Sequence, residues 1–330
     1  MKTVKKAVAL LLAALTVSMA LPAGSFSVSA ENTTDFLGGD GTQGNPYLIS
    51  DKAHLNNVRA YPDAYFLIVV DIVFSAADFA AGGAFYNDGQ GWEPIGASEG
   101  SAFTGTFDGD GHTITGLVCN RTGAESVYAG LFGYNKGSIQ NLGMIDAHLN
   151  ARTTSPSDSV YVGGISGYND RTIANCYNTG NIISNSFNDH ANAGGIAGYN
   201  NGTIINCYNT GMVSSVSAFY YAGGGIAGIN YGTIKSCYNT GNITAEVISV
   251  ETGGIAGYSF DTGIISNCYN IGEISAQSST DAYNGLCDAG GIAGYKSSKS
   301  VISNCYSVGN ITAGAAGTKA ASPQDRKSVV

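Results

Sequence analysis

The feature that most constrains the fold of this chain is a motif that recurs six times at nearly regular intervals. Each copy is a short apolar run that begins with glycine, such as Gly-Leu-Phe-Gly-Tyr-Asn or Gly-Ile-Ala-Gly-Tyr. Successive starts lie 34, 31, 30, 29 and 37 residues apart, at Gly130, Gly164, Gly195, Gly225, Gly254 and Gly291. A period of this size is typical of solenoids, in which each repeat packs only against its neighbours. The chain is therefore expected to fold as a stack of similar coils.

A second motif, typified by Asn-Cys-Tyr-Asn-Thr-Gly, lies between the glycine motifs. Its cysteines occupy one repeat position and should form a structural column: Cys176, Cys207, Cys237, Cys268 and Cys305. An earlier copy has Leu142 there, which indicates apolar packing, because buried free cysteine behaves as a small hydrophobic residue. Disulfides are the alternative in an exported chain, although the chain has seven cysteines, an odd number. No Cys-x-x-Cys motif occurs, so the column predicts no metal site.

A tyrosine follows each column cysteine, and these tyrosines are the candidate surface-contact residues: Tyr177, Tyr208, Tyr238, Tyr269 and Tyr306. Asparagine follows the first four of them, and stacked amides and rings would stabilise successive coils. Strict strand alternation places Ile173 and Tyr177 on one face and Cys176 on the other, whereas a bend between them reverses this. If the tyrosines face solvent, they form an aromatic stripe suited to contact with a sugar or a protein.

Each repeat contains three segments that favour strands, because β-branched residues, tyrosine and glycine dominate them. Residues 194–199, 203–208 and 241–245 exemplify the three. We expect an all-β fold, a right-handed parallel β-helix with three strands in each coil of roughly 30 residues and an N-terminal cap. The segment between the third strand and the next glycine motif varies most in length, which predicts variable loops along one edge.

The repeats occupy residues 101–313, and the two ends of the chain differ from them in composition. Residues 1–30 have early lysines, an apolar stretch and a small-residue cleavage site, as in a secretory signal peptide, and nothing later is suited to span a membrane. Residues 31–100 should form the cap and first coils, with a short helix over residues 51–60 that Ser50 caps. Residues 314–330 form a tail, and the back-translation of residues 325–330 reads like a sequencing adaptor, so we expect a truncated gene.

Charge and residue pattern argue against several functions. The net charge of −9 becomes −12 without the three lysines of the signal peptide, so nucleic acid is a poor partner. A catalytic β-helix needs clustered carboxylates, but the candidates do not recur in register: Asp146, Asp170, Glu246, Glu251, Asp261 and Glu273. Residues 108–112 resemble the start of a calcium loop, yet Cys119 stands where an EF-hand needs glutamate. The sequence therefore predicts no catalytic residue, no metal and no cofactor.

These motifs resemble the GLUG-motif repeats of exported bacterial proteins. The motif is visible at residues 130–133 and as Gly-Gly-Ile-Ala-Gly in later copies, and residues 103–114 resemble the segment that leads into such repeats. The resemblance covers roughly residues 47–313. That family includes adhesin-like surface proteins and the non-catalytic N-terminal regions of immunoglobulin A1-specific metallopeptidases. The zinc motif of those peptidases is absent from this sequence, so no catalytic residue is carried over.

The resemblance implies a non-catalytic protein that is secreted or held at the cell surface and acts in adhesion or ligand display. Its partner would be a host or bacterial surface protein or glycan. Two alternatives stay open: an accessory region of a larger secreted metallopeptidase, and a polysaccharide-degrading β-helix enzyme. The change from Leu-Phe to Ile-Ala in the motif, together with the added cysteine column, departs from the usual pattern and leaves the ligand open.

Overall fold

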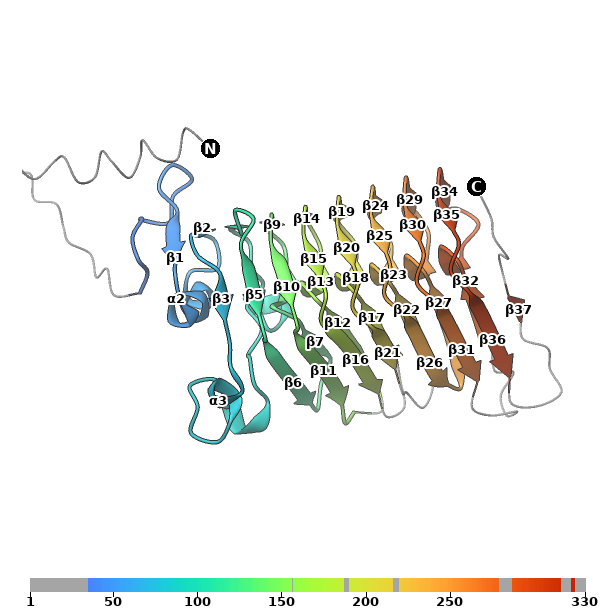
Figure 1. Ribbon diagram of the computed structural model, residues 1–330, viewed down its shortest axis with the longest axis horizontal. Coiled ribbons are helices and arrows are strands. Elements are labelled where there is room, and N and C mark those ends of the chain that lie inside the picture. The colour runs from blue at the N-terminus through green and yellow to red at the C-terminus, as the bar shows by residue number, and fades with distance from the viewer. Residues whose placement is uncertain are drawn as a thin grey trace, which may run out of the picture. The chain divides into compact units, whose positions relative to one another are not determined.

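The computed structural model describes residues 35–155, 157–186, 190–215, 220–278, 287–315 and 322–323. In these residues short strands pair in parallel from one coil to the next, as Figure 1 shows, and the predicted all-β solenoid is confirmed. The signal peptide expected at residues 1–30 and the segment at residues 325–330 lie outside the described residues.

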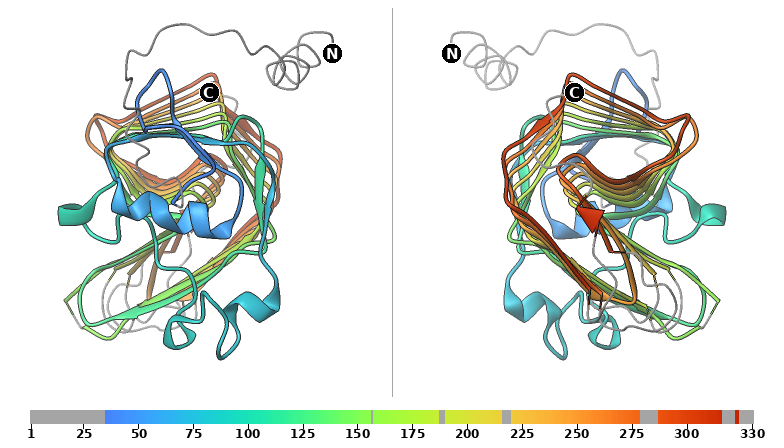
Figure 2. Two further views of the ribbon diagram at one scale, coloured as in Figure 1. Left: turned by 90° about the vertical axis from the view of Figure 1, so that its left-hand side faces the viewer. Right: turned by 90° about the vertical axis from the view of Figure 1, so that its right-hand side faces the viewer.

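Each coil from the first glycine motif onward contains five short strands, so the prediction of three strands for each coil was wrong. The strands form five parallel sheets, which we number in the order in which the chain visits them after the glycine motif. The coils follow nearly the same path when they are viewed along the stack in Figure 2. Sheet 1 contains β8 (Phe132–Asn135), β13 (Ser166–Asn169), β18 (Ala197–Asn200), β23 (Ala227–Asn230), β28 (Ala256–Ser259) and β33 (Ala293–Lys296).

The second and third predicted strand segments contribute to the next three sheets. Sheet 2 contains β1 (Tyr47–Ile49), β2 (Tyr65–Ile68), β4 (Thr106–Asp108), β9 (Ser138–Gln140), β14 (Thr172–Ala174), β19 (Thr203–Ile205), β24 (Thr233–Lys235), β29 (Ile264–Ser266) and β34 (Val301–Ser303). Sheet 3 contains β3 (Ile72–Val73), β5 (Thr113–Thr115), β10 (Gly143–Ile145), β15 (Tyr177–Asn178), β20 (Tyr208–Asn209), β25 (Tyr238–Asn239), β30 (Tyr269–Asn270) and β35 (Tyr306–Ser307). Sheet 4 contains β6 (Val118–Gly123), β11 (His148–Thr153), β16 (Asn181–Ser186), β21 (Val213–Ser215), β26 (Ile243–Val247), β31 (Ile274–Ser278) and β36 (Ile311–Ala315).

Sheet 5 lies in the segment that was expected to form variable loops. It contains β7 (Val127–Ala129), β12 (Val160–Gly163), β17 (His190–Gly194), β22 (Tyr220–Gly224), β27 (Ser249–Gly253), β32 (Cys287–Gly290) and β37 (Ser322–Pro323). The length of this segment varies only at its start, between sheets 4 and 5, whereas the residues just before the glycine motif, which were expected to belong to the loops, form strands in constant register. Residues 187–189, 216–219 and 279–286, which precede three of these strands, lie outside the described residues.

A bend at the residue before each column cysteine separates sheet 2 from sheet 3. This residue has a positive φ in six successive copies, close to 55°: Asn141, Asn175, Asn206, Ser236, Asn267 and Asn304. Asparagine adopts this left-handed conformation more readily than most residues, although serine accepts it once here. The bend breaks strand alternation, so that both Ile173 and Cys176 point inward and Tyr177 does not. The alternative of a bend, which the sequence left open, is therefore the one that the structure shows.

Two buried ladders of asparagine side chains run along the stack. In sheet 1 the side-chain amides of Asn135, Asn169 and Asn200 each donate to the asparagine of the next coil at 2.8 Å. In sheet 3 Asn178, Asn209 and Asn239 do the same at 2.9 Å. The ladder residues are fully buried, so these bonds supply the partners that the desolvated amides require.

The glycine motif has a steric explanation in this fold. In four of the six copies a side chain on the first glycine of the motif would collide with the asparagine ladder of sheet 3; at Gly225, for example, an added Cβ would lie 2.5 Å from the Cβ of Asn239. In the five later copies a side chain on the second glycine would collide with the backbone of sheet 5 one coil earlier; at Gly198 it would lie 2.5 Å from the amide nitrogen of Val162. Both glycines are thus required by close backbone approach.

The N-terminal residues cover the first coils with helices and aromatic side chains. The helices are α2 (Lys52–Asn57), α3 (Ala76–Phe79) and the 3-10 turns η1 (Val58–Ala60), η2 (Asn87–Gly89) and η3 (Glu99–Ser101). The predicted short helix is present and buries Leu55 and Val58, but Asp51 caps it instead of Ser50. The Asp51 carboxylate accepts from the backbone N–H of His54 at 2.8 Å, which its charge favours at a helix N-terminus.

Candidate functional site

The five candidate tyrosines form one continuous stack along sheet 3. Neighbouring ring centroids lie 4.8, 4.8, 4.9 and 5.2 Å apart from Tyr177 to Tyr306, with interplanar angles of 3° to 7°. The first four rings are half-buried, and Tyr306 is 43% exposed. We call this set the tyrosine column. Because the adjacent asparagines and cysteines are buried, the column presents the aromatic surface of sheet 3 to solvent.

The five column cysteines lie on the opposite side of the backbone, in the core. Each has at most 1% of its surface exposed, and all seven cysteines of the chain are free thiols. The backbone N–H of each column cysteine, up to Cys268, lies 3.4 Å from the sulfur of the next. Burial raises the pKa of Cys207 and Cys237 well above the ordinary thiol value. The disulfide alternative is not what the structure shows, and Leu142 occupies an equivalent core position.

The two cysteines outside the column are buried as well. Cys119 has no exposed surface, and burial raises its pKa to about 12. Cys287 is 4% exposed, and burial also raises its pKa. Because the thiolate is the reactive form, neither residue has the environment of a nucleophile or a metal ligand.

The structure brings together two carboxylates that the sequence pattern did not pair. Glu251 in β27 and Asp288 in β32 are direct neighbours in sheet 5, and they are 3% and 7% exposed. Burial, and secondarily the charge of Asp288, raises the pKa of Glu251 to about 8. Burial also raises the pKa of Asp288. Both residues precede the first glycine of their motif by three positions, so counting back from that glycine would have revealed the pair.

The other candidate carboxylates do not gather into a site. In the described residues no group of three or more His, Cys, Asp and Glu side chains could hold a metal ion. The turn at residues 108–112 is a local structure: Asp108 accepts from the backbone N–H of Asp110 at 2.9 Å and from the side chains of Gln140 and Asn141. These residues form a tight turn between β4 and β5.

A second aromatic array, which the sequence did not predict, lies where sheets 5 and 1 meet. Tyr134, Tyr168 and Tyr199 stack in sheet 1 at 4.3 and 4.5 Å. Tyr128 and Tyr161 stack in sheet 5 at 5.3 Å and meet the first set edge to face, with 5.5 Å between Tyr128 and Tyr134. Burial raises the pKa of Tyr134 to about 12. The array is rigid because each ring contacts at least two others.

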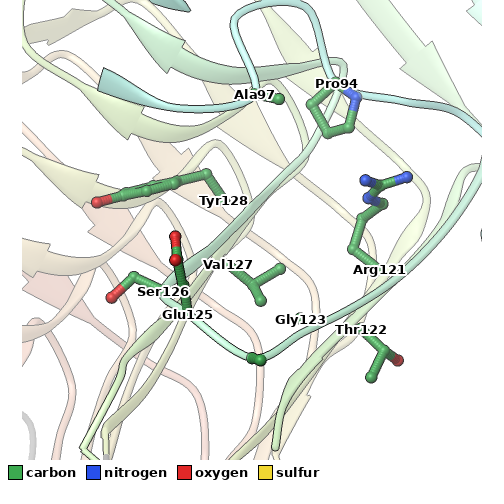
Figure 3. Close-up of a pocket in the computed structure, with 10 residues that line it drawn as sticks. Pro94, Ala97, Arg121, Thr122, Gly123, Glu125, Ser126, Val127 and Tyr128 are labelled. Atoms are coloured by element: carbon green, nitrogen blue, oxygen red, sulfur yellow. The ribbon is translucent and has the colours of Figure 1, made fainter. Parts of the chain in front are cut away.

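A pocket of about 350 Å³ lies at the N-terminal end of this array. Figure 3 shows Arg121 and Tyr128 on opposite sides of it, with Pro94 between them at the rim and with Glu125 and Ser126 beside Tyr128. The volume falls within the range of small-molecule sites, and the lining combines an aromatic ring with polar groups of both charges. Sequence reasoning missed this pocket because its residues lie before or between the recognised motifs.

Comparison with known proteins identifies the repeats. The model of the family described as "The GLUG motif" matches residues 158–183, 189–217 and 219–244. A protein of Evansella cellulosilytica, provisionally named a Gly-rich membrane protein, is 37% identical over 155 residues, which are 45% of this chain and 16% of that protein. Halomucin of Haloquadratum walsbyi is 36% identical over 156 residues, 45% of this chain and 2% of halomucin. The chain thus spans a small part of these relatives.

One solved structure shares the fold. It is a chain from Bacteroides ovatus, provisionally named an immunoglobulin A1 protease, with a TM-score of 0.62 and 24% sequence identity. The similarity covers 87% of this chain and 84% of that chain. At this level of identity the comparison shows a common solenoid architecture.

Proposed function

We propose that this chain, a parallel β-solenoid with GLUG-motif repeats, is a non-catalytic surface protein. In this proposal it displays the tyrosine column for contact with a protein or glycan. The observation that carries the proposal is the outward position of five stacked tyrosines over four successive coil spacings. Isoleucine, cysteine and asparagine already fill the core of the same coils. The tyrosines are therefore not needed to fill the interior.

The chemistry of the column suits recognition. Tyrosine is enriched in protein interfaces because it buries a large rigid surface at low entropic cost and also offers a hydroxyl group. Offset rings at a regular spacing present one long amphipathic strip, which suits an extended partner such as a polymer or a strand. No helix of the described residues is long and apolar enough to cross a membrane. Export through the expected signal peptide would place the strip outside the cell.

An accessory role in a larger secreted peptidase is the second candidate, and the observation that favours it is the fold shared with a chain provisionally named an immunoglobulin A1 protease. The two candidates differ in what the solenoid does alone. As an adhesion or display protein it binds its partner without any further domain. As an accessory region it acts only with the peptidase. Binding by the purified chain therefore favours the first candidate.

The tyrosine column is tested by removing three central rings. We expect the variant Tyr208→Ser, Tyr238→Ser and Tyr269→Ser to lose at least about tenfold in affinity for partners identified on glycan and host-protein arrays, since aromatic contacts at interface centres contribute about 2 kcal/mol or more each. The control is Thr203→Ala with Thr233→Ala, which alters half-exposed side chains on neighbouring sheet 2. Binding that survives the tyrosine substitutions at full strength would contradict the proposal.

A further inference from the structure

We propose that the pocket between Arg121 and Tyr128 binds a carboxylate-bearing sugar residue, with the guanidinium group on the carboxylate and the tyrosine ring against the sugar ring. This site goes beyond the tyrosine column, because it is built from other elements. The pocket is lined by residues from the end of β6 and the start of β7, together with Pro94 and Ala97. The proposal rests on four properties of these residues.

The first is the position of Arg121 in the fold. Arg121 pairs in register with Ala151, and the same position of sheet 4 then holds Ser184, Ser215, Ala245 and Ala276. All of these small residues are buried in the core. An arginine at a core-facing position is unusual, and here its side chain lines the pocket (Figure 3).

The second is that this cation has no anionic partner among the described residues. The Nη1 atom of Arg121 is buried and makes no hydrogen bond. Neighbouring Arg59 instead pairs with Glu93 at 3.2 Å and lies over the Trp92 ring at 4.9 Å. Burial lowers the pKa of Arg59, and the charge of Arg121 lowers it further despite Glu93. A guanidinium that has one buried nitrogen without a hydrogen bond and lies near a second cation favours an incoming anion, and its fork of donors matches a carboxylate.

The third is the rigid ring of Tyr128. Its stack with Tyr161 at 5.3 Å and its edge contact with Tyr134 at 5.5 Å hold it in place before any ligand arrives. The electron-rich face of such a ring attracts the C–H groups of a pyranose, and a ring that is already ordered loses little entropy on binding.

The fourth is the charge balance, which discriminates among anions. Glu125 lines the same pocket and is exposed, so Arg121 and Glu125 together contribute no net charge. A phosphate dianion would be repelled by Glu125. A sugar acid carries one negative charge for Arg121 and hydroxyl groups that donate to Glu125 or Ser126. The pocket volume of about 350 Å³ accommodates one such residue with part of a second.

Calorimetric titration of the full chain with three probes tests the assignment. We expect methyl β-D-glucuronide to bind at least tenfold more tightly than methyl β-D-glucoside, and sodium acetate to bind at least tenfold more weakly than the glucuronide. Arg121→Gln should remove the preference for the glucuronide. The matched control, Arg152→Gln, changes an exposed arginine on the next strand of sheet 4 and should leave binding unchanged.

The outcomes separate this site from the tyrosine column. Tyr128→Phe should keep glucuronide binding within about twofold, whereas Tyr128→Ser should weaken it at least fivefold. The triple serine variant of the column should bind glucuronide normally, so either proposal can fail without the other. Equal affinity for glucuronide and glucoside, equal affinity for acetate and glucuronide, or unchanged binding by a folded Arg121→Gln variant would each overturn the inference.

Discussion

Replacing Glu251 with glutamine is expected to stabilise the protein by several kcal/mol at pH 8 and to have little effect at pH 4.5. Burial raises the pKa of this carboxyl group from 4.5 in the unfolded chain to about 8 in the fold. Above pH 4.5 the unfolded chain releases the proton while the folded chain keeps it. The group therefore lowers the free energy of unfolding progressively as the pH rises towards 8, by up to about 1.4 kcal/mol for each pH unit.

The neutral glutamine removes this dependence. Chemical denaturation of the wild type and of Glu251→Gln between pH 4.5 and pH 8 measures the difference directly. Glu246→Gln is the control, because Glu246 lies nearby in β26 and is exposed to solvent. Asp288 adds to the effect by its charge, although burial is the larger cause. Parallel stability curves for the wild type and Glu251→Gln across this range would contradict the buried position of the carboxylate.

Replacing Gly225 with alanine is expected to cost about 3 kcal/mol or more. An added Cβ would meet the backbone oxygen of Gly254 and the side chain of Asn239, two groups that are held in place by the next coil and by the asparagine ladder. Overpacking a rigid core typically costs 1–3 kcal/mol, and displacing Asn239 would also break a buried hydrogen bond. The same contact recurs at Gly195 and Gly254, so the stack has no room to shift locally.

Thermal and urea unfolding measure the cost of this substitution. Gly44→Ala is the matched control, because an added Cβ there would meet no atom within 4 Å and the backbone does not require a positive φ. This control should be neutral or slightly stabilising, since alanine reduces the entropy of the unfolded chain. A Gly225→Ala variant as stable as Gly44→Ala would show that the motif glycine is not required by packing.

The stacking of the coils could be predicted from the sequence because recurrence itself fixes the register. Residues at one repeat position must form a column, whatever the local conformation, and the pairing of Tyr177 with Tyr208 follows from that. The number of strands could not be predicted as securely. The bend before Cys176 depends on one residue in the left-handed region, and the serine at the equivalent position 236 gives no signal for such a conformation.

The sites outside the column were less accessible to sequence reasoning. Glu251 and Asp288 occupy equivalent positions, but only two copies carry an acid there, so the pattern is easily missed without the strand register. The pocket at Arg121 is formed by residues around 94–97 and 121–128, all of which precede the first glycine motif at Gly130. Their proximity depends on the tertiary structure of the first coils, and pattern matching carries no information about that.

Hydroxyl-radical footprinting of the native chain, read for each residue by mass spectrometry, determines whether each Cys-Tyr-Asn triplet turns cysteine and asparagine inward and tyrosine outward. We predict oxidation of the column tyrosines, fastest at Tyr306, while the column cysteines are protected until denaturant is added. Rapid oxidation of Cys207 and Cys237 with protection of Tyr208 and Tyr238 would show the opposite orientation and contradict both the core and the proposed contact surface.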